Sequence, residues 1–117
     1  MKGKEHNNHI NYLEFKAKNL DHIKLFYGTV FGWTFRDYGV NYVAFEDSGL
    51  SGGFEFSQDA VVNGALVVLY HSDLEQIQKK VEAAGGIITQ EIFAFPGGRR
   101  FHFKDPSGNE LAIWSET

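Results

Sequence analysis

Residues 10–32 read INYLEFKAKNLDHIKLFYGTVFG, and residues 64–86 read GALVVLYHSDLEQIQKKVEAAGG. The second stretch follows the first at an offset of 54 residues. The two share a pattern of apolar and glycine positions rather than many identical residues. Three positions match across the offset: Leu20 with Leu74, Ile23 with Ile77, and Gly32 with Gly86. A repeat at a fixed spacing indicates two copies of one structural module.

Each copy begins with a predicted strand, which a predicted helix follows. Residues 10–16 alternate apolar and polar side chains, the period of a half-buried strand, whereas residues 65–71 are almost all apolar and predict a more buried strand. Ser72 and Glu75 are expected to form a capping box at the start of the second helix, and Gly85-Gly86 to end it. An apolar stripe at helical spacing marks each helix: Leu20, Ile23, Tyr27 and Val30 in the first, and Leu74, Ile77, Val81 and Ala84 in the second.

Three further strands are predicted after each helix, with turn signals between them. Gly and Pro in Asp47-Ser48-Gly49 and in residues 105–109 favour tight turns, and residues 92–98 are expected to form a loop. The prediction is an α+β chain of two βαβββ modules, about residues 9–58 and 64–116, in one domain after a flexible N-terminus of residues 1–8. The strands are expected near residues 33–38, 41–47, 52–57, 87–91, 98–104 and 109–115.

The composition argues against several classes of function. A net charge of −4 provides no basic surface for nucleic acid, and no apolar run approaches the ~20 residues of a membrane span. The absence of Cys removes disulfides, thiol catalysis and Cys-based zinc sites. Residues 1–8 lack the apolar segment of a signal peptide, so a cytoplasmic location is expected. The 11 Phe, 5 Tyr and 2 Trp predict a Phe-rich core, with aromatic side chains left over for a ligand surface.

Three motifs, taken together in their order along the chain, resemble the vicinal-oxygen-chelate superfamily of glyoxalase I, extradiol dioxygenases, fosfomycin-resistance enzymes and bleomycin-binding proteins. Residues 25–33, LFYGTVFGW, are similar to the family's helix-to-strand segment, and residues 105–109, DPSGN, to a turn before its last strand. Gly52-Gly53-Phe54 also occurs in the metal-free branch. The resemblance covers residues 9–116. It implies eight strands in a U-shaped cup, with helices on one face and a ligand site on the other.

Alternation along the strands assigns side chains to the two faces of that implied sheet. A reversed register would bury Arg100, His102 and Lys104 against an apolar layer, which is unfavourable without partners. Glu14 is expected at the rim of the implied cup. The helix face should carry Leu13, Phe15, Phe54, Phe56, Val67, Leu69, Phe101, Phe103, Leu111 and Ile113. The ligand face should carry Tyr12, Glu14, Tyr42, Glu55, Leu66, Val68, Arg100, His102, Ala112 and Trp114.

The resemblance also implies four metal-ligand positions, on the first and last strand of each module, which usually hold His or Glu. A catalytic first-row metal needs about three protein N, O or S ligands. Among the residues at these positions only Glu55 is an ordinary ligand, so we predict no metal and no other cofactor. The four residues are Tyr12, Glu55, Leu66 and Ala112.

Two functions of different class follow from these residues. The first is a metal-independent binding protein for a small, partly aromatic molecule. Its predicted ligand contacts are Tyr12, Tyr42, Leu66, Arg100, Ala112 and Trp114.

The second is a lyase, isomerase or dioxygenase of the same superfamily that uses Glu55 and His102 as acid/base groups, or a residual metal site. For Glu55, burial would favour a general-base role, and an ion pair with Arg100 is the alternative. A protein-interaction module with a closed cup is a further alternative. The resemblance implies a homodimer, and neither nucleic acid nor membrane is expected as a partner.

Overall fold

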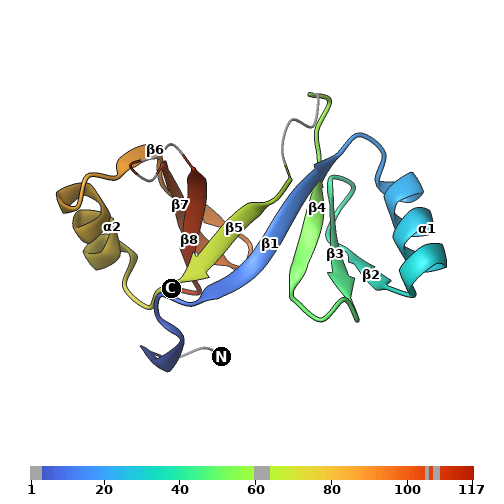
Figure 1. The fold of residues 1–117 in the computed structure, drawn as a ribbon, viewed down its shortest axis with the longest axis horizontal. Helices are drawn as coiled ribbons and strands as arrows, with labels where there is room; N and C mark the ends of the chain where they lie inside the picture. Colours follow the sequence, from blue (N-terminus) through green and yellow to red (C-terminus); the bar gives the residue numbers. More distant parts are fainter. Residues whose placement is uncertain (1–3, 60–63, 105, 107–108) are drawn as a thin grey trace. The chain divides into compact units, whose positions relative to one another are not determined.

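The computed structural model describes residues 4–59, 64–104, 106 and 109–117, and the chain forms two compact units (Figure 1). The α1 unit is Tyr12–Leu66, and the α2 unit is Met1–Asn11 with Val67–Thr117. Each unit follows the predicted βαβββ order, which confirms the α+β class. The elements after the short helix η1 (Lys4–His6) are β1 (Ile10–Ala17), α1 (Leu20–Phe31), β2 (Thr34–Asp37), β3 (Tyr42–Glu46), β4 (Gly52–Phe56), β5 (Leu66–Tyr70), α2 (Leu74–Ala83), β6 (Ile87–Phe95), β7 (Gly98–Lys104) and β8 (Glu110–Ser115).

Each unit contains four strands of mixed direction in the same arrangement. The α1 unit has the order β2-β3-β4-β1, and the α2 unit has the mirrored order β5-β8-β7-β6. The first strand of each module pairs in parallel with its last strand, so that Leu13 lies opposite Gly52 and Val67 opposite Leu111. The remaining pairs are antiparallel. The two modules therefore share one topology, as the repeat predicts.

The α1 unit buries an aromatic core between its helix and its strands. Phe15 and Phe54 stack with ring centroids 5.3 Å apart, and Tyr27 on α1 stacks on Trp33 at 4.8 Å. Phe45 contacts both groups. Such ring pairs contribute about 0.5–1.5 kcal/mol each beyond the burial of area, so part of the high aromatic content belongs to this core.

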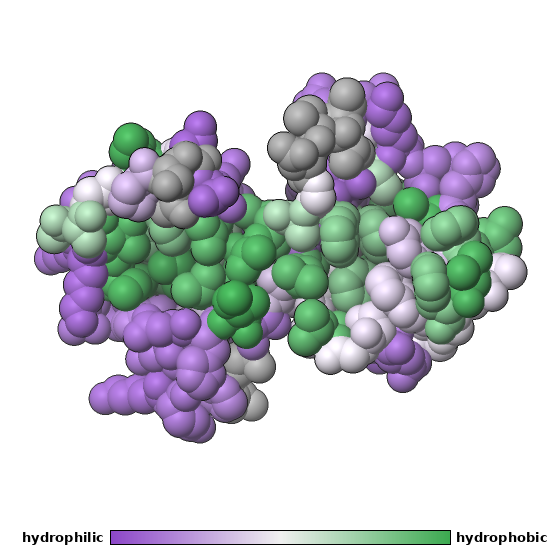
Figure 2. Space-filling model, in the orientation of Figure 1, coloured by the Kyte–Doolittle hydropathy of each residue, from purple (hydrophilic) through white to green (hydrophobic). Residues whose placement is uncertain are grey.

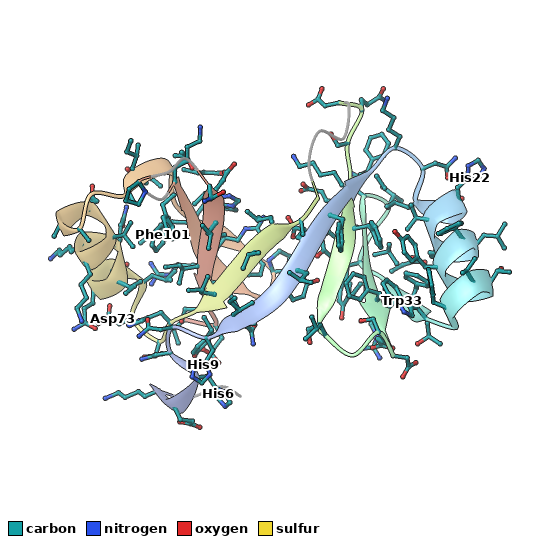
Figure 3. All side chains as sticks on the ribbon, viewed as in Figure 1. His6, His9, His22, Trp33, Asp73 and Phe101 are labelled. Carbon is teal, nitrogen blue, oxygen red and sulfur yellow. The ribbon has the colours of Figure 1, made fainter. Side chains whose placement is uncertain are left out.

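The α2 unit buries an aliphatic and Phe core under its helix. Leu74, Phe101 and Ile113 form its centre, and Leu69 and Phe103 pack against them. Phe101 lies between α2 and the strands (Figure 3). The two cores confirm the predicted helix face at six of its ten positions, which are Phe15, Phe54, Leu69, Phe101, Phe103 and Ile113.

Three expectations about the two helices are wrong. The cap of α2 is Asp73, whose side chain accepts a hydrogen bond from the Gln76 backbone N–H, so the predicted Ser72–Glu75 capping box is wrong. Ser72 instead exchanges two hydrogen bonds with Asn7. Val30 lies outside the core and Ala84 lies beyond the last residue of α2, so neither belongs to its predicted stripe.

Within the described residues, neither helix is long and apolar enough to span a membrane.

Strand β6 is longer than its sequence predicts, and it continues through most of the expected loop at residues 92–98. Its pairing with β7 shifts between Ile88 and Gln90 and again between Gln90 and Phe93. Each shift breaks the two-residue alternation that identifies a strand. The turn at residues 105–109 lies largely outside the described residues.

Candidate functional site

The face of the α2 unit opposite its helix carries four of the predicted site residues. Register places Arg100 opposite Trp114 and His102 opposite Ala112 on neighbouring strands β7 and β8. Phe101, between the two polar residues of β7, points into the core under α2. Arg100, His102, Ala112 and Trp114 therefore come together on one face, which we call the β7–β8 face.

Two aromatic rings of β6 hold the guanidinium group of Arg100. Its Cζ atom lies 5.6 Å from the ring centroid of Phe93 and 5.9 Å from that of Phe95. Both separations fall within the range of a cation–π interaction. Arg99, one residue earlier, reaches the opposite way and pairs with Glu75 of α2, with 2.7 Å between Nη1 and Oε2. This contrast confirms the register chosen from the sequence.

His102 is buried, with 8 % of its surface exposed, and two groups fix its ring. Phe93 stacks on it at a centroid distance of 5.9 Å. The Nδ1 atom lies 3.3 Å from Oε2 of Glu110, at the start of β8. A carboxylate at this place selects the tautomer and orientation of an imidazole, and it forms an ion pair only when the ring is protonated.

Trp114 is held at its edge and stays partly exposed. Its indole N–H donates a hydrogen bond of 2.9 Å to Oδ1 of Asn11, and its ring contacts Tyr70 and Phe95 at centroid distances of 5.4 and 6.3 Å. Burial, and then a hydrogen bond to Glu116, raise the pKa of Tyr70 to about 12, so Tyr70 stays neutral beneath the indole. The indole is therefore a pre-positioned aromatic surface.

The α1 unit carries a second polar group, on its face opposite α1. The hydroxyls of Tyr12 and Tyr42 lie 2.6 Å apart, and the Tyr42 hydroxyl donates to Oε1 of Glu14 at 3.3 Å. Glu14 is only 7 % exposed, so its predicted rim position is wrong. Burial, followed by the hydrogen bond with Tyr12 and the charge of Glu14, raises the pKa of Tyr42 well above its ordinary value.

Gly53 makes room for this group. It lies opposite Glu14 in the β1–β4 pairing, and a Cβ atom built on it would come within 2.5 Å of the Tyr42 hydroxyl oxygen. The Tyr42 ring thus lies across the glycine backbone to reach Glu14. The alternation of β1 does not predict the burial of Glu14, because that burial depends on Tyr42 and Gly53 of neighbouring strands.

Replacing Tyr42 with Phe is expected to lower the free energy of unfolding by about 1–3 kcal/mol, because the half-buried Tyr12 hydroxyl and the buried Glu14 carboxylate lose a partner. Urea titration of the purified protein measures this change. Tyr38→Phe, at a largely exposed ring, should leave stability within ~0.5 kcal/mol. Since the pKa of Tyr42 is raised in the folded state, its neutral hydroxyl adds to the free energy of unfolding below pH ~10, and this stabilisation is lost as pH rises further. That loss should shrink in Tyr42→Phe, and equal alkaline profiles would contradict this assignment.

The two remaining predicted site residues are Glu55 and Leu66. Glu55 lies opposite Tyr42 in the β3–β4 pairing and faces Lys16, with 4.0 Å between Oε1 and Nζ. Its side chain is 45 % exposed, so it lacks the burial that a general-base role would require. Leu66 begins β5.

The donor chemistry at the four implied metal-ligand positions does not suit a metal. The Tyr12 hydroxyl is engaged with Tyr42, Leu66 and Ala112 offer hydrocarbon only, and Glu55 alone has a carboxylate. Within the described part of the chain, no three His, Cys, Asp or Glu side chains are grouped so that they could hold a metal ion.

Comparison with known proteins places this geometry in a family. The sequence model of the family described as the Glyoxalase/Bleomycin resistance protein/Dioxygenase superfamily matches residues 9–113 of this chain. No curated protein matches the sequence.

Several solved structures are similar to this chain at low sequence identity. Methylmalonyl-CoA epimerase from Mycobacterium tuberculosis is 13% identical, with a TM-score of 0.74 over 98% of this chain and 92% of that chain. A glyoxalase/bleomycin resistance protein/dioxygenase superfamily member from Vibrio splendidus 12B01 is 13% identical, with a TM-score of 0.72 over 89% and 96%. The Mn(II)-bound glyoxalase from Novosphingobium aromaticivorans is 23% identical, with a TM-score of 0.66 over 92% of this chain but 38% of that one. These similarities show the fold.

Proposed function

We propose that this chain, which belongs to the Glyoxalase/Bleomycin resistance protein/Dioxygenase superfamily, binds a small aromatic molecule on its β7–β8 face without a metal ion. The observation that carries the proposal is the grouping of Trp114, Arg100 and the two Phe rings of β6 on one face of the α2 unit. Small-molecule sites combine apolar and aromatic walls with a few fixed polar groups. The β7–β8 face has this composition.

Ala112 and Trp114 support the metal-independent part of the proposal together. Ala112 is fully buried and stands where the family resemblance implies a ligand, and Trp114 is its neighbour on the same face of β8. A methyl group cannot donate an electron pair, whereas an indole offers contact area and one N–H donor. In this proposal the chain holds its ligand by contact rather than by coordination.

A thermal-shift titration in EDTA tests the proposal, with matched pairs of planar aromatic anions and neutral counterparts such as benzoate and benzamide. Binding to the folded state raises the melting temperature in proportion to ln(1 + [L]/Kd). Concentration-dependent shifts in EDTA support a metal-independent site. Shifts that appear only after Mn²⁺, Ni²⁺ or Zn²⁺ is added would overturn it.

The metal content of the purified protein gives a separate prediction. We expect well below ~0.1 equivalent of Zn, Ni, Mn or Fe after purification without a metal-affinity column, because a single ordinary ligand cannot retain such an ion. Elemental analysis by plasma mass spectrometry measures this directly. Near-stoichiometric metal that disappears in Glu55→Ala would show that the implied ligand positions do bind.

The His102–Glu110 pair favours one alternative, an acid/base enzyme in the same fold. A buried imidazole oriented by a carboxylate is a recurrent general base, and here it adjoins the proposed ligand surface. Glu55 is the weaker member of the predicted catalytic pair because of its exposure. Chemical change of a bound compound, followed by NMR, distinguishes this alternative from binding alone.

A further inference from the structure

A short polar segment, residues 4–9, precedes β1 and belongs to the α2 unit. It begins with η1, and all of its residues are Lys, Glu, His or Asn. None of the residues of η1 is buried, and Figure 2 shows hydrophilic side chains around this short helix, at the lower left. Apolar burial therefore contributes little to the attachment of this segment, which depends on hydrogen bonds instead.

Asn7 attaches the segment to the loop before α2 with both ends of its side-chain amide. Its Oδ1 atom accepts a hydrogen bond of 2.8 Å from the Ser72 backbone N–H, and its Nδ2 atom donates to the Ser72 hydroxyl at 3.2 Å. An amide carries its donor and its acceptor on one planar group, so a contact that uses both fixes the orientation of that group. We call these two hydrogen bonds the Asn7 clasp.

Asn8 sets the register of the residues that follow the clasp. Its φ of 68° lies in the left-handed region, which Asn tolerates better than most residues. The Asn8 N–H donates to the Tyr70 carbonyl oxygen at 2.8 Å, and the Tyr70 N–H donates to the His9 carbonyl oxygen at 3.2 Å. Two residues thus lie opposite one, as in a β-bulge. Because a bulge shifts the alternation of side chains by one residue, it determines the side to which Asn11 points.

Asn11 is the residue that holds the indole of Trp114. Its Oδ1 atom accepts the indole N–H at 2.9 Å. Tyr70, whose backbone pairs with the bulge, also contacts the indole ring, at a centroid distance of 5.4 Å. The clasp, the bulge and the indole therefore form one connected set of contacts within the α2 unit, although Asn7 and Asn8 lie outside the β7–β8 face.

We propose that Asn7 and Asn8 are positioning residues, which hold Asn11 in the register that orients the Trp114 indole. The consequence for ligand affinity rests on the proposed function. If the indole adopts its binding orientation for only a fraction of the time, the apparent Kd rises by the inverse of that fraction. The family match begins at residue 9, so membership of the family does not assign this role to Asn7 or Asn8.

Two pairs of variants test the clasp and the bulge separately. Asn7→Ala removes both hydrogen bonds of the side chain, whereas Asn7→Asp keeps an acceptor for the Ser72 N–H and can also accept from the Ser72 hydroxyl. Asn8→Val places a β-branched residue in the left-handed region, whereas Asn8→Gly adopts that region without steric cost. The conservative member of each pair should behave as the wild type does.

The indole N–H groups of Trp33 and Trp114 give two signals in NMR of nitrogen-labelled protein, because the chain has 2 Trp. In Asn7→Ala and Asn8→Val, the Trp114 signal should shift and its hydrogen exchange should become at least ~10-fold faster. Trp33, in the core of the α1 unit, is the internal reference and should not change. The Kd for benzoate should rise about 3- to 10-fold in the same two variants, while circular dichroism keeps the wild-type spectrum.

The signal of the free protein separates this inference from the proposed function. Unchanged exchange at Trp114 in both Asn7→Ala and Asn8→Val overturns the inference, whatever the ligand result. Faster exchange at both Trp33 and Trp114 overturns it as well, because the segment then serves general stability. Faster exchange at Trp114 with an unchanged Kd for benzoate overturns the consequence for affinity. If Trp114 responds as expected but the wild type does not bind benzoate, the positioning role is supported and the proposed function is contradicted.

Discussion

Replacing Gly52 with Ala is expected to destabilise the α1 unit by about 3 kcal/mol or more, because the added Cβ overlaps atoms that have no free space to move into. The Cβ would meet the ring of Phe45 and the backbone carbonyl oxygen of Leu13 closer than any ordinary contact. The ring belongs to the buried aromatic core. The carbonyl belongs to the parallel pairing between β1 and β4, in which Leu13 and Gly52 are opposite each other. The clash therefore separates strands as well as displacing a side chain.

A matched substitution should act in the opposite direction. Gly28 lies in α1 with an ordinary helical conformation, and a Cβ built there approaches only the Trp33 carbonyl oxygen, at 3.5 Å. Gly28→Ala should raise stability by about 0.5–1 kcal/mol, the difference in helix propensity. Thermal and urea unfolding of both variants measure the contrast. An unchanged melting temperature in Gly52→Ala would show that the close β1–β4 pairing is not rigid.

These two glycines illustrate what sequence could and could not predict. Gly52-Gly53 was recognised only as part of a family-like motif. The structure gives each glycine a separate reason, since Gly52 accommodates Phe45 on the core side and Gly53 accommodates Tyr42 on the opposite side. Both reasons depend on cross-strand register, and a pattern within one strand carries no information about the neighbouring strand.

The predicted faces of β7 and β8 were accurate for a physical reason. Arg100 and His102 alternate with Phe101 and Phe103, and only one register keeps charge out of the core. That argument needs nothing beyond the strand itself. It fails at Glu14, where β1 also alternates, because burial there depends on Tyr42 reaching across from β3. It fails again at β6, whose pairing irregularities interrupt the alternation.

The helix predictions divide in the same way. The ends at Gly32 and Gly85 follow from the left-handed backbone that each adopts, with φ of 76° and 100°, a property of glycine that sequence reports directly. Val30 was placed in the core stripe because three- and four-residue spacings fit two faces of α1 at once. When a helix is apolar on both sides, its sequence does not show which side faces the core, because that depends on what each side contacts.

The second large effect is expected at Trp114, as a loss of ligand affinity rather than of stability. If the β7–β8 face is the binding site, the partly exposed indole is its largest aromatic side chain, and it is already positioned by Asn11, Tyr70 and Phe95. A pre-positioned ring loses little conformational entropy when a ligand binds. Trp114→Ala should therefore weaken binding by about 1–3 kcal/mol, which is about 5- to 150-fold in Kd.

Two companion variants separate the parts of this prediction. Trp114→Phe keeps an aromatic ring but loses the hydrogen bond to Asn11, and it should retain affinity within about tenfold. Arg100→Gln should weaken benzoate and leave benzamide unaffected, because only the carboxylate gains a charge-assisted bond from the guanidinium. Calorimetric titration gives the Kd values, and the melting temperature of each variant confirms that it is folded. If folded Trp114→Ala binds both compounds as the wild type does, the ligand lies elsewhere, and the indole serves only to close the face over Tyr70.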